Sequence, residues 1–117
     1  MDIEKFRSFC LSLPDTDEGM PFQGFFRNSR SILVFYVHSK MFCLLDIDNF
    51  ESCTIKCHTD KIEELKDNYL AVANPFNLSK KHWISVGFDK DLSDEKILKL
   101  VEDSYELVKK NPKKTNL

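Results

Sequence analysis

The chain has 117 residues, of which 42% are hydrophobic and 31% are charged, and its formal net charge is −2. This length suits one domain, and the composition is that of a globular chain rather than a disordered one. No apolar run approaches the ~20 residues of a membrane-spanning helix, so we expect no membrane association, no export signal and a cytoplasmic location. Because nucleic-acid-binding domains are usually basic overall, a role of that kind must rest on a local patch of charge.

The N-terminal segment predicts one helix and a loop. Apolar residues recur at helical spacing across residues 2–13, and Asp2 is a suitable N-cap. Pro14 ends this helix, and the acidic residues after it predict a loop over residues 14–19.

An antiparallel meander is expected next. Residues with high β propensity predict a short strand at 22–27, a turn at 28–30, and further strands at 32–37, 41–47 and 53–57.

The hairpin at the centre of this meander determines which side chains share a face. His38 and Ser39 occupy its two-residue turn, although neither is favoured at the positive φ that such turns require. Strict alternation in the following strand predicts that Phe42 and Leu44 share one face. The opposite face is expected to carry Met41, Cys43, Leu45 and Ile47.

The second half of the chain predicts two helices around one or two strands. Thr59 or Asp60 is expected to cap the first of these helices, and Asp60 with Glu63 resembles a capping box. A loop at residues 74–79 then leads to a strand at 84–88.

The last helix has the clearest pattern. Ser93 is a favourable N-cap, and Asn111 with Pro112 ends the helix. The inward apolar stripe consists of Leu98, Val101, Tyr105 and Val108.

These elements together predict an α+β fold with the order α-β(3-4)-α-β(1-2)-α. We expect a two-layer sandwich in which the N-terminal and C-terminal helices pack on one face of an antiparallel sheet. Residues 1–112 form the single domain of this prediction, and residues 113–117 a frayed tail. The other sheet face is expected to be partly exposed. It offers an alternative function, binding of a protein partner or a second copy of the chain, through Phe25, Phe35, Phe42 and Phe50.

Catalytic motifs are absent from the sequence. Its three glycines are scattered and form no phosphate-binding loop, and it contains neither HExxH nor a nucleophile elbow. Cys53 and Cys57 are spaced C-x3-C without a second pair of ligands, so we expect reduced, buried thiols rather than a metal site. The patterns therefore predict a non-enzymatic protein with no catalytic residues, no cofactor and no bound metal.

One basic and aromatic cluster is the main candidate for binding. Its members are consecutive: Lys80, Lys81, His82 and Trp83. Basic side chains beside an aromatic ring can hold a phosphate backbone while the ring stacks or packs. Lys40 and Lys56 join this patch if they reach the same side of the sheet. The alternative is that Trp83 is a core anchor and the lysines are only solvated.

Five segments of the chain carry a family resemblance. They are FCLSLPDTDEGMPF (9–22), VFYVHSKMFCLLDID (34–48), IKCHTDKIEEL (55–65), LSKKHWISV (78–86) and DSYELV (103–108). They resemble the bacterial MmcQ/YjbR family, most specifically in the fourth segment. The resemblance implies a small α+β sandwich similar to bacterial frataxin homologues, a DNA-binding role through a double-wing arrangement, and no catalytic activity.

The resemblance also implies a site and a partner. Lysines would contact phosphates, with His82 or Trp83 packed at the rim, which implies weak, sequence-tolerant binding to double-stranded DNA. The implied residues are Lys80, Lys81, His82, Trp83, Lys40 and Lys56. The chain departs from the family at residues 38–39, where a Gly-Gly turn is typical, and at residues 76–79, where Tyr-His-Met-Asn is common. Frataxin-like iron binding by acidic clusters at residues 15–18, 46–51 and 60–67 is a minor alternative.

Overall fold

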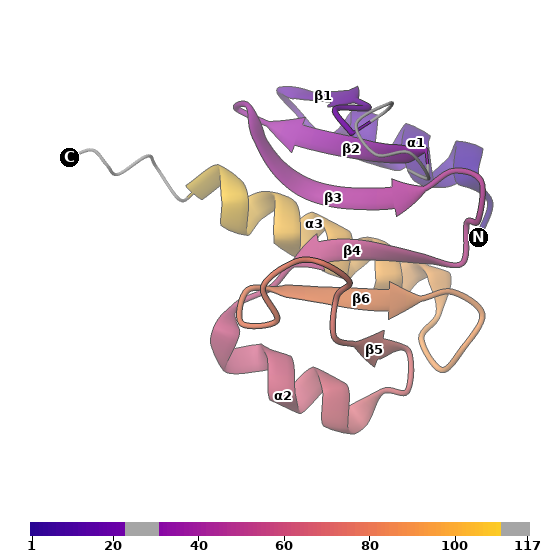
Figure 1. Ribbon diagram of the computed structural model, residues 1–117, viewed down its shortest axis with the longest axis vertical. Helices are drawn as coiled ribbons and strands as arrows, with labels where there is room; N and C mark the ends of the chain where they lie inside the picture. Colours follow the sequence, from indigo (N-terminus) through magenta and orange to yellow (C-terminus); the bar gives the residue numbers. More distant parts are fainter. Residues whose placement is uncertain (23–30, 111–117) are drawn as a thin grey trace.

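The computed structural model describes residues 1–22 and 31–110, and it shows an α+β fold (Figure 1). In chain order the elements are α1 (Ile3–Ser12), β1 (Thr16–Gly19), β2 (Ile32–Val37), β3 (Lys40–Asp46), β4 (Ser52–Lys56), α2 (Thr59–Asn68), β5 (Val72–Ala73), β6 (Trp83–Gly87) and α3 (Asp94–Lys110).

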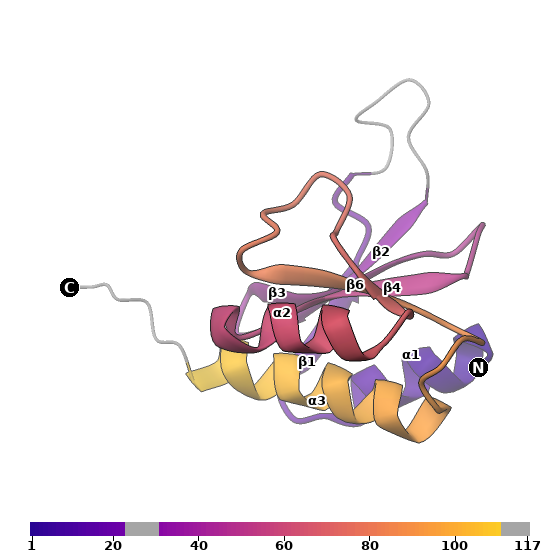
Figure 2. The same cartoon turned by 90° about the horizontal axis from the view of Figure 1, so that it is seen from below.

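The strands form one antiparallel sheet in the order β1-β2-β3-β4-β6-β5. All three helices lie on the same side of this sheet (Figure 2). The predicted α+β class, with terminal helices packed on one sheet face, is therefore confirmed.

Two of the predicted helix caps are confirmed and one is wrong. The Asp2 carboxylate accepts from the Lys5 N–H at 2.8 Å, and the Ser93 hydroxyl accepts from the Lys96 N–H at 3.1 Å. At α2, His58 occupies the N-cap position without a side-chain hydrogen bond. Thr59 does not cap this helix because its hydroxyl donates to the Lys81 carbonyl oxygen at 2.8 Å.

The loop expected at residues 14–19 is wrong, because Thr16–Gly19 form the edge strand β1. Acidic residues are uncommon in strands, but an edge strand tolerates them. Here the Arg7 guanidinium on α1 donates to both carboxylate oxygens of Glu18. This bond holds the pKa of Glu18 below its ordinary value and ties β1 to α1.

Other predictions near the chain's centre and end fall outside the described residues. Phe22 lies in a turn, and the rest of the strand expected at 22–27, including Phe25, is not described. The turn expected at 28–30 and the tail expected at 113–117 are likewise outside the described residues.

A β-bulge at Phe42 breaks the alternation predicted for β3. Phe35 pairs with Cys43 and Tyr36 pairs with Met41, so Phe42 is the extra residue on its strand. The face assignment for Phe42 was therefore wrong: it points toward the helices together with Cys43. Met41 instead lies on the opposite face with Leu44.

The main core lies between the sheet and the helices, and three of the four aromatic residues expected on an exposed face, Phe35, Phe42 and Phe50, belong to it or pack against it. Phe35 and Phe42 are both 0% exposed. Phe50 packs on Phe6 and Phe88, with ring centroids 5.8 and 4.5 Å away. The prediction of an exposed sheet face carrying these three rings is wrong, because they pack on the side of the sheet that the helices cover, where the bulge directs Phe42.

The sheet face opposite the helices carries a smaller apolar cluster. Val34, Leu44 and Trp83 are buried there, and Phe22 and Leu78 pack against them. Leu78 belongs to the loop between β5 and β6, which crosses this face (Figure 2). This loop therefore covers part of the face that sequence reasoning left open.

Candidate nucleic-acid interface

The candidate site begins where two neighbouring strands separate. β3 and β4 pair only between residues 43–45 and 53–55. Toward the start of β3 the two strands diverge, as Figure 1 shows. The buried Ser104 hydroxyl bridges this gap: it donates to the Phe42 carbonyl oxygen at 2.6 Å and accepts from the Lys56 N–H at 2.9 Å. Both backbone groups are therefore satisfied although the strands are apart.

A hollow of about 280 Å³ lies at this separation. Its walls are Lys40, Met41, Lys56, Trp83 and Val108. The Lys56 Nζ lies 5.6 Å from the centroid of the Trp83 ring, within the range of a cation–π contact. Trp83 is only 8% exposed, which confirms that it is a core anchor. Its ring can orient Lys56 but presents no open face on which a base could stack.

Lys80, Lys81 and His82 lie in the loop that leads into β6, and all three are exposed. The loop backbone is fixed: the Ser79 carbonyl oxygen accepts from the N–H groups of His82 and Trp83 at 3.1 and 3.0 Å. The His82 Nδ1 lies 3.5 Å from the Thr59 hydroxyl at the start of α2. The lysine side chains thus extend into solvent from an anchored loop.

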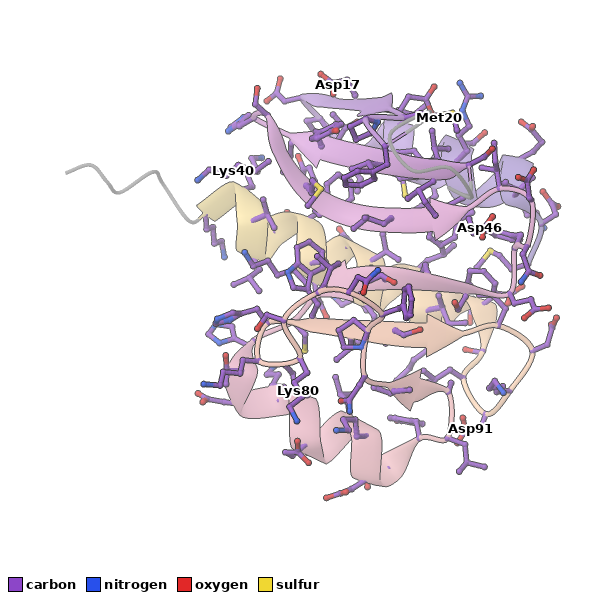
Figure 3. All side chains as sticks on the ribbon, viewed as in Figure 1. Asp17, Met20, Lys40, Asp46, Lys80 and Asp91 are labelled. Atoms are coloured by element: carbon purple, nitrogen blue, oxygen red, sulfur yellow. The ribbon has the colours of Figure 1, made fainter. Side chains whose placement is uncertain are left out.

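The structure divides the six predicted site residues into two groups. Lys40, Lys56 and Trp83 meet at the hollow. The other group, Lys80 to His82, belongs to the neighbouring loop. Figure 3 shows the separation: Lys40 lies beside the last turns of α3, whereas Lys80 lies on the far side of β6.

Three of these lysines form no ion pair with a carboxylate among the described residues. Within residues 1–22 and 31–110, Lys56, Lys80 and Lys81 form no ion pair. Two lysines elsewhere in this part of the chain do: the Lys99 Nζ lies 3.1 Å from Asp103, and Lys66 pairs with Glu63. Because Lys80 and Lys81 are adjacent and exposed, the loop before β6 is locally basic on a chain whose net charge is −2.

Sequence reasoning missed one exposed aromatic residue beside this patch. Phe76 is 85% exposed and belongs to the same loop as Lys80 and Lys81. Its sequence context could have predicted this exposure, because in Asn74-Pro75-Phe76-Asn77 a large ring stands among turn-forming residues.

The four cysteines are placed as structural thiols and not as reactive nucleophiles. Cys10, Cys43 and Cys53 are buried free thiols, and Cys57 is half-buried. Burial raises the pKa of Cys43 well above its ordinary value and also raises the pKa of Cys57, so both thiols are protonated and poor nucleophiles at neutral pH. In the described part of the chain, no three His, Cys, Asp or Glu side chains are grouped so that they could hold a metal ion.

The helices of the described residues are too short or too polar to span a membrane.

Comparisons with known proteins identify the family. The chain is similar to Deinococcus radiodurans protein DR2400, described as a DUF419 domain: the two are 30% identical, with a TM-score of 0.80, over 93% of this chain and 79% of that one. A crystal structure of a Pseudomonas syringae protein gives 21% identity and a TM-score of 0.74, over 92% of this chain and 99% of that one. A solution NMR structure from the same organism gives 20% identity and a TM-score of 0.69, over 92% of this chain and 93% of that one.

The two Pseudomonas structures share the fold. No curated protein matches the chain. The YjbR family model matches residues 11–107, which include β1 to β6 and nearly all of α3. The chain therefore belongs to the YjbR family, as the sequence resemblance predicted.

Proposed function

We propose that this chain is a non-enzymatic cytoplasmic protein that binds double-stranded DNA weakly through its phosphate backbone. The observation that carries the proposal is the set of lysines without carboxylate partners among the described residues, Lys56, Lys80 and Lys81. Lys80 and Lys81 lie in the loop that leads into β6, and Lys56 lies over Trp83, which belongs to the cluster on the sheet face opposite the helices. A duplex phosphate is the natural partner of such a group because it supplies repeated negative charge at fixed spacing.

Each member of the site has a separate role in this proposal. Lys80 and Lys81 contact phosphates from the anchored loop, which serves as one of the two wings of a double-wing arrangement. Lys56, held over Trp83, contacts a further phosphate beside Lys40. His82 donates from the rim. Phosphate contacts set position and affinity but read no bases, so binding is sequence-tolerant.

The test is fluorescence anisotropy of a labelled duplex over a range of salt concentrations. Three phosphate contacts predict that the logarithm of the association constant falls with log salt at a slope of about −2.7. The variant Lys80→Glu/Lys81→Glu should abolish binding. Its matched control is Lys5→Glu/Lys96→Glu, which makes the same charge change on exposed positions of α1 and α3. Absence of wild-type binding at low salt, or equal losses in both variants, would contradict the proposal.

Lys56 can be tested separately because Trp83 is the chain's single tryptophan. The variant Lys56→Met keeps an apolar stem over the ring but removes the charge. It should reduce the salt slope by about 0.9, the contribution of one phosphate. Titration of wild type with the duplex should also change Trp83 emission. An unchanged slope would remove Lys56 from the site.

A further inference from the structure

The loop between β5 and β6 carries an aromatic ring that does not pack in the core. Phe76 is 85% exposed. Side chains of this kind normally bury most of their surface because water contact with the ring is unfavourable. An exposed ring next to a binding surface is a common anchor for a ligand.

The loop that carries this ring is anchored on both sides of Phe76. On one side, the Lys66 Nζ donates to the Asn74 side-chain oxygen at 2.8 Å, which ties the loop to α2. On the other side, Leu78 packs into the cluster around Trp83. Between them Asn77 adopts φ 61°, the left-handed conformation that turns the chain. Phe76 therefore projects from a fixed loop rather than from a loose one.

The ring and the unpaired lysines lie within reach of one short ligand. Lys80 follows Phe76 by four positions, so their Cα atoms are at most about 14 Å apart. About four nucleotides of a strand span that distance at 3.4 Å per base. An aromatic ring beside a basic track that follows the backbone is the combination by which proteins hold unpaired strands. Trp83 cannot supply this ring because it is buried.

We propose, resting on the proposed function above, that this surface prefers single-stranded nucleic acid, with Phe76 stacking on an unpaired base while Lys80 and Lys81 hold the adjacent phosphates. A duplex offers Phe76 no open base face, since its bases are already stacked and separating them costs energy. Duplex binding then uses the lysines alone, and single-strand binding adds the ring.

The experiment compares a labelled thymidine oligonucleotide, a uridine oligonucleotide and a mixed-sequence duplex at one salt concentration. Wild type should bind the stronger of the two single strands about tenfold more tightly than the duplex, the expected effect of one stacked base. Phe76→Ala should remove that tenfold advantage, and Phe76→Tyr should retain it. The matched control is Leu70→Ala, because Leu70 is 87% exposed and its N–H is bonded to Asp91, which lies away from Lys80 in Figure 3.

The outcomes separate this inference from the proposed function. Equal binding of single strand and duplex, or single-strand binding that Phe76→Ala leaves unchanged, overturns the inference and leaves duplex binding intact. No binding to any of the three probes overturns both. Light scattering on the same proteins adds one more outcome: a dimer that Phe76→Ala converts to a monomer would show that the ring packs on a second copy, and this too overturns the inference. Tighter binding of thymidine or of uridine, lost in Phe76→Ala, supports it and identifies DNA or RNA as the source of the strand.

Discussion

At the scale of single residues, two polar side chains hold together segments that have no regular pairing. Ser104 on α3 is 1% exposed. Its hydroxyl donates to the Phe42 carbonyl oxygen on β3 and accepts from the Lys56 N–H on β4, where these two strands are separated. The Asp91 carboxylate accepts from the N–H groups of Leu70 and Ala71 at 2.7 and 2.9 Å. The first contact maintains the hollow at the candidate site, and the second fixes the start of β5.

Substitution of Ser104 tests the first contact. Ser104→Ala leaves two backbone groups without their partner, one of them fully buried, so the free energy of unfolding should fall by about 1–3 kcal/mol. Chemical denaturation measures this change. Ser12→Ala is the matched control because its hydroxyl bonds the Phe9 carbonyl at an exposed position, and it should change stability by less than about 0.5 kcal/mol. Equal effects of the two substitutions would show that the Ser104 hydroxyl does not stabilise the separated ends of β3 and β4.

Asp91 predicts a pH dependence of stability. The bonds from Leu70 and Ala71 hold the pKa of Asp91 below its ordinary value in the folded chain. The unfolded chain then binds the proton more readily, so this carboxylate stabilises the fold above the ordinary pKa of an aspartate and loses that contribution as pH falls through its lowered folded pKa. The stability difference between wild type and Asp91→Asn should therefore shrink as pH is lowered from 7 toward 3. Denaturation curves at several pH values measure it, and a difference that does not vary with pH would refute this role.

At the scale of elements, the loop at residues 74–82 behaves as a structural element although it contains no regular structure. Thr59, Lys66 and the cluster around Trp83 each anchor a different part of it. It positions both the lysines of the proposed DNA site and the exposed Phe76. The proposed binding therefore depends on the order of this loop.

Leu78 is the apolar anchor of this loop, so Leu78→Ala should loosen it. Trypsin should then cut after Lys80 and Lys81 faster than in wild type, because proteolysis requires local opening. Trp83 emission should shift to the red as water reaches the ring. Mass spectrometry of a timed digest locates the cuts, and Leu70→Ala serves as the exposed control. An unchanged cleavage rate at these two lysines would show that Leu78 is not the anchor.

At the scale of the whole molecule, two apolar clusters share one sheet. Leu33 and Phe35 of β2 face the helices, whereas Val34 of the same strand belongs to the cluster around Trp83. Loss of either cluster removes the support of these strands, so the clusters should unfold together. We expect Trp83 fluorescence, which reports one face, and far-UV circular dichroism, which reports the helices, to give the same denaturation midpoint. An earlier fluorescence transition would show that the cluster around Trp83 is a separate, weaker unit.

The distribution of charge over the protein surface also depends on the fold of the whole molecule. The chain's formal net charge of −2 does not by itself favour binding to nucleic acid. The fold pairs Glu18 with Arg7 and Glu63 with Lys66, and it leaves Lys56, Lys80 and Lys81 without an ion pair among the described residues. The basic character of the candidate site therefore depends on where the fold places these lysines and not on the overall composition.

Elements whose signals are local could be predicted from the amino-acid sequence alone. Asp2 and Ser93 mark the starts of α1 and α3 because a cap acts within three residues of itself. The hairpin at His38 and Ser39 was also predictable, although both residues adopt positive φ, because the strands on either side define it. The cluster from Lys80 to Trp83 could be recognised from residue types alone.

Tertiary structure decided what depends on residues far apart in the chain. Thr16–Gly19 form a strand because they pair with β2 and because Arg7 bonds to Glu18. No local sequence pattern predicts either contact. The Phe42 carbonyl at the bulge finds its hydrogen-bond partner in Ser104, 62 residues away. Burial of Trp83 under Leu78, and with it the exposure of Phe76, follows from the path of one loop across the sheet. Periodicity shows which face of an element is apolar, but only packing decides what covers that face, and the candidate site is a consequence of that covering.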